Sequence, residues 1–493
     1  MKLISFGFLF LWILSEKIYS QQSFRIDFVK TISFNNYQLK SVSYGNPLIG
    51  YFKSTDLTRT KRGTTLRLIP PSYKGKIEFY GVTSDNRHLN LGTKHFTSPL
   101  PKSFLLIRTK VRGTFSRPFF LLSGALPHYS LKKPHSGQAK PNLPFKNNRR
   151  FTFPMIVNRL GEIIWVYIPF PNNMPINTYF VSKQVSKGTY GFLAGKKRSH
   201  FMTVNFEGEI MQQLDLKKTT NSMPLHHDFD RYDGRKFYSL GYSRAQYGTD
   251  KTYLSNSIVR VDITQKTIST IWDLKNTFNP YENEWSDQSE KSSHFVHWNQ
   301  ENVDYDFIHA NELKFYKQGI LMSFRHLNRI GLFDLDKKEF IWTLGASQEN
   351  SIQAVGDAKF SSQHSPFFDK NGHIVLLDNG LLSKRTRIIG LRIGDGKAHL
   401  AWQFPQKSSL FSKSRGSVQA LDGNRILTLF VSPKFKGKKL SKYTRSDHLI
   451  EFDYRSGKKI GQMIITFLCK SPGYRSVPLL SIGSEDFISF FKD

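Results

Sequence analysis

Apolar and polar residues alternate over short stretches along most of this chain. Each stretch runs for about five to eight residues, the length of a half-buried strand, and ends in a turn of Gly, Asn, Asp or Lys. The three-to-four-residue spacing of an amphipathic helix is scarce. The pattern predicts an all-β protein.

A repeat begins at about residue 151. Its units recur at roughly 50 to 70 residues, the range of propeller blades with long loops, and each closes with a turn and a short strand. The closing segments are GEIIWVYIPF, GEIMQQLDL, TISTIWDL, EFIWTLGA, KAHLAWQF and GKKIGQMIITF. These six closing strands predict a six-bladed β-propeller. A β-solenoid is the alternative, but its coils are shorter and hold one or two strands where these units offer about four.

The pattern divides the chain into three parts. Residues 1–20 are expected to be a signal peptide and residues 21–148 a small N-terminal β-sandwich. Residues 149–493 would form the propeller. The polar stretch at 132–150, rich in Pro and Lys, is typical of a linker between the last two parts.

The first residues have the features of a processing signal. Lys2 supplies the positive start, the apolar run extends from Leu3 to Leu14, and Ser20 is a small residue at a plausible cleavage point. This run is too short to cross a bilayer, although a retained anchor is the alternative. Since no later stretch is long and apolar enough, we expect no transmembrane segment after the signal. The mature protein is predicted to be secreted or periplasmic.

The chain is strongly basic. It holds 71 Lys and Arg against 38 Asp and Glu, a formal charge of +33. Such a charge favours anionic partners: sulfated or phosphorylated small molecules, acidic glycans, lipid surfaces or nucleic acid. The only dense basic stretch, Lys434 to Arg445, is typical of a solvated loop, and no nucleic-acid-binding module is present.

Cys469 is the only cysteine. A disulfide within the chain and a cysteine-based metal site are therefore both excluded. The thiol could link two chains in a homodimer, and a buried, inert thiol is the other reading.

Three of the repeating units begin alike. Each has a histidine, a strand, a Gly-containing turn and a second strand, as in MPLHHDFDRYDGRKFYSLGY, DFIHANELKFYKQGILMSFRH and SQHSPFFDKNGHIVLLDNG. The histidines at the shared position are His226, His309 and His364. Because the first strand of each propeller blade lines the central channel, these three side chains should converge on the axis. Arg325, at the end of the hairpin that starts with His309, could reach the same pocket.

This constellation has two other interpretations. A single histidine at a strand start is more often structural than functional, but three at one repeat position beside an arginine favour a site. Three histidines could also hold zinc in an open catalytic site. A guanidinium is repelled by a divalent cation, whereas arginine and imidazole donors suit an oxyanion. The pocket is therefore predicted to bind sulfate or phosphate, without a metal.

The strings HHDF, DFIHANEL followed by SFRH, IWTLGA and QHSPFFDKNGHIVLLDNG resemble the bacterial arylsulfate sulfotransferase family. The resemblance is clear from about residue 223 to residue 404. It implies a six-bladed propeller behind a β-sandwich, exported to the periplasm. It also implies sulfuryl transfer from an aryl sulfate donor to a phenolic acceptor, without a cofactor and without an adenylyl phosphosulfate donor. Family members often carry a cysteine pair, which this chain lacks.

The resemblance also implies roles for individual residues. The nucleophilic histidine falls on His364, the second histidine on His309 and the arginine on Arg325. The remaining histidine falls on the HHD string; we favour His226, which has the same spacing to Asp228 as His309 has to Asn311, with His227 the alternative. Asn311 would orient His309 or contact the sulfuryl group, or serve only at the strand end.

A neutral imidazole is a competent nucleophile at neutral pH, and the expected kinetics are ping-pong through a sulfohistidine. Either His226 or His309 would act as general base toward the acceptor phenol. Two other functions stay open at this point. One is a secreted, non-catalytic propeller that binds acidic glycan or lipid, and the other is a metal-dependent hydrolase that uses the three histidines.

Overall fold

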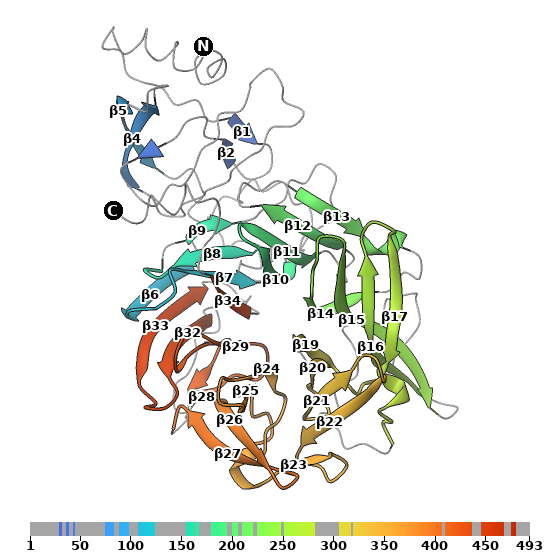
Figure 1. Cartoon of the computed structure of the whole chain (residues 1–493). Coiled ribbons are helices and arrows are strands. Elements are labelled where there is room, and N and C mark those ends of the chain that lie inside the picture. Colours follow the sequence, from blue (N-terminus) through green and yellow to red (C-terminus); the bar gives the residue numbers. More distant parts are fainter. Residues whose placement is uncertain are drawn as a thin grey trace, which may run out of the picture.

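In the residues that it describes, the computed structural model of the chain is built of β-strands with a few short 3-10 turns (Figure 1). It describes residues 29–31, 36–38, 43–44, 74–82, 88–97, 107–123, 154–161, 163–166, 179–194, 200–205, 210–219, 224–247, 251–281, 305–316, 319–406, 410–435, 445–467 and 475–479. The all-β class predicted from the alternating pattern is confirmed. Within these ranges, no helix has the length and apolar character needed to cross a membrane.

Sets of four antiparallel strands, paired in chain order, surround a common centre (Figure 1). One set is β10 (Tyr179–Ser186), β11 (Thr189–Ala194), β12 (His200–Asn205) and β13 (Ile210–Asp215). The next is β14 (Leu225–Asp230), β15 (Lys236–Tyr247), β16 (Lys251–Asp262) and β17 (Thr267–Asp273). The third is β19 (Ala310–Tyr316), β20 (Gly319–Phe324), β21 (Arg329–Asp334) and β22 (Glu339–Gly345).

The fourth set is β24 (His364–Phe368), β25 (Ile374–Asp378), β26 (Arg387–Gly394) and β27 (Lys397–Phe404). It is joined to β22 through the short strand β23 (Ile352–Ala354). A further set is β29 (Ser417–Ala420), β30 (Arg425–Phe430), β32 (Arg445–Asp453) and β33 (Lys459–Phe467). The closing segments predicted from the sequence after the first one correspond to β13, β17, β22, β27 and β33, and each is the fourth strand of its set.

Strands from before residue 149 also take part in these sheets. β6 (Ile107–Gly113) pairs with β33, along the outside of its sheet. β7 (Phe119–Ser123) lies between β34 (Arg475–Leu479) and β8 (Met155–Asn158), and β9 (Ile163–Val166) completes that set. The sheets of the ring therefore draw on both sides of the domain boundary predicted after residue 148, and early and late strands join in the same sheets.

The predicted N-terminal sandwich falls mostly outside the described residues. Described there are β1 (Val29–Thr31) paired with β2 (Asn36–Gln38), and β3 (Ser43–Tyr44), β4 (Lys74–Val82) and β5 (His88–Thr97) in one sheet. The sandwich stays a prediction. The signal segment, Cys469 and residues 436–444 of the basic stretch lie outside the described residues.

Neighbouring sheets are held together by apolar side chains between them. Phe307, Met322 and Phe324 are fully buried in one such layer, against the face of the preceding sheet that carries Leu240 and Ile258. Burial of a side chain of this size stabilises the fold by about 1.5–3 kcal/mol each. These layers fix the inner strands of adjacent sheets relative to one another.

Gly390 is one of the positions at which close packing within a sheet depends on glycine. A Cβ atom built on Gly390 of β26 would lie 2.2 Å from Cε2 of Trp402 on β27, because the indole covers the glycine. We expect Gly390→Ala to displace Trp402 and to lower the free energy of unfolding by about 1–3 kcal/mol, measured by urea denaturation. Gly394→Ala, on the same strand, is the control because nothing lies within 4 Å of its Cβ. Equal stability of the two variants would contradict this account.

Candidate active site

The predicted histidines lie at or beside the starts of three first strands, β14, β19 and β24. These strands are nearest the centre of the ring (Figure 1). His226 and His227 are on β14, His309 directly precedes β19, and His364 opens β24. Each strand has a register shift near its histidine, so the ladder is interrupted where the side chains leave the sheet.

The two adjacent histidines of β14 point to different partners. The ladder to β15 shifts between His226 and Phe229, and His227 has a φ of 58° in the left-handed region. His227 Nε2 lies 2.9 Å from His309 Nε2. The sequence left open which histidine belongs to the site, and the bulge brings His227 to His309.

His226 is turned toward Asn256 of β16. The Asn256 Oδ1 accepts a 2.7 Å hydrogen bond from the backbone N–H of Ala310, so its Nδ2 amide is the group 3.0 Å from His226 Nε2. The His226 ring also stacks on Tyr242, with centroids 3.9 Å apart. His226, 1% exposed, is thus buried beside Asn256, whose amide oxygen binds the backbone of Ala310, the residue that follows His309.

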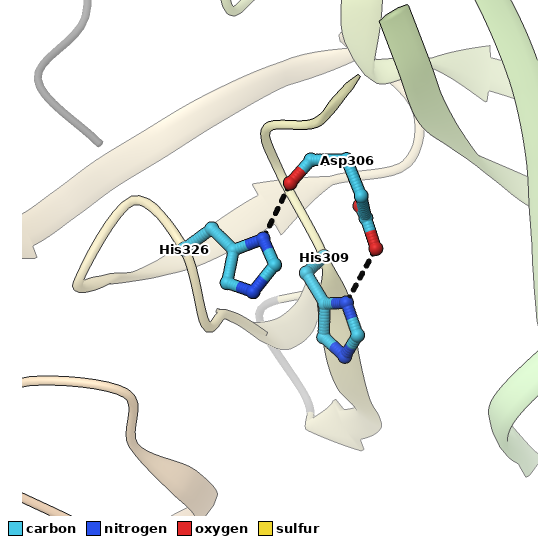
Figure 2. A group of neighbouring side chains, drawn as sticks. All are labelled: Asp306, His309 and His326. Carbon is cyan, nitrogen blue, oxygen red and sulfur yellow. Dashed lines mark hydrogen bonds and ion pairs between the residues drawn. The ribbon is translucent and has the colours of Figure 1, made fainter. Parts of the chain in front are cut away.

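His309 is paired with a carboxylate (Figure 2). Its Nδ1 lies 2.6 Å from Oδ2 of Asp306, which ends the two-residue strand β18 (Tyr305–Asp306) alongside β16. Burial raises the pKa of Asp306, but the attraction of the neighbouring His309 and the hydrogen bond to its ring outweigh burial and bring the pKa to about 2. Asp306 is therefore ionised at any working pH, and the Nδ1 proton of His309 is directed at it.

The same aspartate holds a further histidine through its backbone (Figure 2). His326 Nδ1 donates to the carbonyl oxygen of Asp306, and His326 Nε2 contacts Nη1 of Arg325. Burial lowers the pKa of His326 to about 3, with His309 and Arg325 acting in the same direction. A neutral ring with its proton on Nδ1 accepts from the guanidinium at Nε2, so His326 links Asp306 to Arg325.

The donor atoms of Asp306, His309 and His326 lie within 4.8 Å of one another, which makes this group a candidate metal site. Ligands on one tetrahedral Zn²⁺ at about 2.0–2.1 Å are separated by roughly 3.3 Å. The 2.6 Å separation of Asp306 Oδ2 and His309 Nδ1 is that of a charge-assisted hydrogen bond. Arg325 adds a fixed positive charge at His326. The distances therefore favour a hydrogen-bonded network over a metal centre.

His364 is held by an amide. Asn379, which follows β25, donates from Nδ2 to the carbonyl oxygens of Ser412 and Arg415, at 2.9 and 3.0 Å. Its Oδ1 therefore faces Nδ1 of His364, 2.7 Å away, and must accept a proton from it. This hydrogen bond sets the tautomer of His364 and places the lone pair on Nε2.

Asn311 connects the strand after His309 to the segment before His364. Its Nδ2 donates to the carbonyl oxygen of Gln363 at 2.8 Å, and both residues are fully buried. The Gln363 amide donates in turn to Ser323, Phe324 and Arg329. These bonds hold the residue just before β24 against β19 and β20, and β24 itself lies next to both strands.

Sequence reasoning missed Asp306, His326 and Asn379. His326 was present in the SFRH string beside Arg325, and Asp306 lies three residues before His309 in DFIH. Asn379 lies in LLDNG, where Asn-Gly is also an ordinary turn signal. The described residues supply an amide-paired imidazole at His364, a carboxylate-paired imidazole at His309 and a buried guanidinium at Arg325, a set suited to moving an anionic group and a proton.

Comparisons with known proteins agree with the residue pattern. A family model described as "Arylsulfotransferase (ASST)" matches residues 128–475. No curated protein sequence matches the chain. Among solved structures, an oligogalacturonate lyase in complex with manganese is similar at a TM-score of 0.37 and 10% identity, over 72% of this chain and 83% of that one.

Two other solved structures are similar at the same distant level. Dihydro-heme d1 dehydrogenase NirN matches with a TM-score of 0.33 and 10% identity, over 90% of this chain and 69% of that one. Apo AztD from Citrobacter koseri matches with a TM-score of 0.31 and 9% identity, over 83% and 96%. Likenesses this weak carry no argument about function.

Proposed function

Because the chain belongs to the arylsulfotransferase family, we propose that it transfers a sulfuryl group from a phenolic sulfate ester to a phenolic acceptor through a sulfohistidine at His364. The family supports arylsulfotransferase activity in general. The ping-pong route and the nucleophile are the parts that we propose.

The chemistry proceeds in two balanced steps. In the first, His364 Nε2 attacks sulfur, the N–S bond forms as the S–O bond to the donor breaks, and a phenolate leaves. In the second, the acceptor oxygen attacks sulfur, the N–S bond breaks, and the acceptor proton passes to a base. Negative charge spreads over the three equatorial oxygens in each transition state, as in phosphoryl transfer.

The observation that carries the proposal is the bond between His364 Nδ1 and Asn379 Oδ1. The amide is fixed by its two carbonyl partners, so the imidazole is kept as the tautomer with a nucleophilic Nε2. The neutral amide partner adds no charge that would favour the imidazolium, and the uncharged imidazole is the form suited to attack on a sulfate ester.

The other residues serve the transferring group. We propose Arg325 as the cation for the sulfuryl oxygens, with His227 and His309 as the facing imidazoles on the other strands. We also propose that the four-stranded sets are six propeller blades, that residues 21–148 include a small sandwich, and that the protein is exported after loss of residues 1–20.

The test uses purified protein and 4-nitrophenyl sulfate, with and without phenol, followed optically. We expect nitrophenol release in repeated turnovers only when phenol is present. Without phenol, one equivalent should be released, and mass spectrometry of the digested protein should find a sulfated peptide that contains His364. Phenol-independent turnover would indicate a sulfatase. No release at all would overturn the proposal in favour of a non-catalytic binding propeller.

A further inference from the structure

We propose that Asp306 is a positioning residue that makes His309 the general base of the acceptor step. Its carboxylate holds the proton of His309 on Nδ1, so that Nε2 receives the proton of the acceptor phenol. This inference rests on the proposed function. It assigns the role of general base to His309, which the sequence left open between His226 and His309.

The geometry of the pair is fixed from the backbone. Asp306 belongs to β18, whose parallel pairing with β16 sets its position, and its side chain is 6% exposed. His309 has a φ of 49°, which turns its ring out of the strand that follows. The 2.6 Å bond between Oδ2 and Nδ1 then leaves the His309 ring one orientation. Its side chain is 19% exposed, more than that of its partner, so a substrate can approach it.

The opposite ring nitrogen meets a donor in the resting site. His309 Nε2 lies 2.9 Å from His227 Nε2. Since His309 Nδ1 carries its proton toward Asp306, Nε2 is the acceptor in that contact and His227 donates. In the acceptor step, the phenol hydroxyl takes the place of the His227 N–H as the donor to His309 Nε2. The hydroxyl proton then passes to the Nε2 lone pair.

The two site histidines differ in the charge of their partners. Asp306 is ionised, with a pKa of about 2, and stabilises the imidazolium that forms when His309 takes a proton. His364 Nδ1 faces the neutral Oδ1 of Asn379, with the carbonyl oxygen of Ser362 at 3.2 Å, and neutral acceptors of this kind give an imidazolium far less stabilisation than a carboxylate. The carboxylate partner therefore favours His309 as the base, and the amide partner favours His364 as the nucleophile.

The test variant is Asp306→Asn, which keeps the size of the side chain and removes its charge. The first step needs no proton acceptor, so the burst of nitrophenol on mixing with 4-nitrophenyl sulfate should stay within a few fold of wild type. Transfer to phenol should slow by about 10²-fold or more, the contribution of a general base. Asp336→Asn, at an exposed turn position, is the matched control and should behave as wild type.

A second acceptor distinguishes a positioned base from a damaged site. Exchange of deuterated 4-nitrophenol into 4-nitrophenyl sulfate, at a mildly alkaline pH where the nitrophenol is ionised, requires no proton transfer. The exchange rate in Asp306→Asn should be close to wild type. Equal loss with both acceptors, or no loss with phenol, would overturn the role of Asp306. Absence of a burst and of turnover in the wild-type protein would instead reject the proposed function.

The tautomer can also be read without changing Asp306. In wild-type protein labelled with ¹⁵N-histidine, the His309 resonances, identified by their loss in His309→Gln, should show a protonated Nδ1 and a bare Nε2 in the neutral ring. A neutral His309 protonated on Nε2 would overturn the inference even if Asp306→Asn does not fold.

Discussion

Replacing His364 with alanine is expected to remove sulfuryl transfer almost entirely, lowering kcat/KM for 4-nitrophenyl sulfate with phenol by at least about 10⁴-fold. Losses of this scale follow removal of a covalent nucleophile. The variant has no atom that can accept the sulfuryl group, so both the burst and the sulfated peptide should disappear. Binding of the donor should persist, because the cation at Arg325 is unchanged.

The assay has an internal check on the chemistry. Added imidazole should restore part of the activity of the His364→Ala variant, since it can enter the space left by the side chain and there accept the sulfuryl group in place of His364. His399→Ala, on the exposed face of β27, is the matched control and should keep full activity. A His364→Ala protein that still gives a burst would place the nucleophile elsewhere.

The strand architecture was accessible from the sequence because short apolar or alternating runs end at turn residues, even though some strands, such as β7 and β25, are buried along their whole length. The Trp-containing and Met-containing closing segments were found because each repeats the same alternation next to a turn. The histidines were found because they recur near the starts of first strands, which a ring of sheets brings to its centre.

The direction of each side chain was not accessible in the same way. Spacing made His226 equivalent to His309, but the register shift at His226 and the left-handed backbone of His227 bring the second histidine of the pair to His309. A bulge is decided by how two strands pair, and the alternation along one strand does not record it. His226 instead meets Asn256, a partner from a different strand of the sheet.

The supporting residues were missed for a related reason. Asp306 and Asn379 have the residue types of ordinary turns, and nothing in their neighbourhood distinguishes them from the many others in this chain. Their roles arise from pairing: β18 against β16 places Asp306, and the carbonyls of Ser412 and Arg415 hold Asn379. Strand pairing also affects the boundary predicted after residue 148. β6 pairs with β33 and β7 pairs with β34, and the sequence pattern alone does not show pairings between strands so far apart in the chain.

Replacing Arg325 with glutamine is expected to lower kcat/KM for the aryl sulfate donor by about 10²–10³-fold, the effect of losing one fixed donor to a developing anion. Arg325 is 5% exposed, and its Nη1 is held by His326, which is itself fixed by the backbone of Asp306. The guanidinium is thus pre-oriented in a site with little water, where its attraction to the sulfuryl oxygens is strongest.

His326 stays neutral beside this charge, with a pKa lowered to about 3, so it orients the guanidinium without repelling it. Arg325→Lys keeps the charge but loses the planar fork, and its rate should fall between wild type and Arg325→Gln. Arg392→Gln, an exposed position on β26, is the matched control. Unfolding temperatures should accompany the rates to show that each variant is folded. If folded Arg325→Gln transfers sulfuryl at the wild-type rate, the cation of this site has to be sought at another residue, and the network from Asp306 through His326 would serve stability alone.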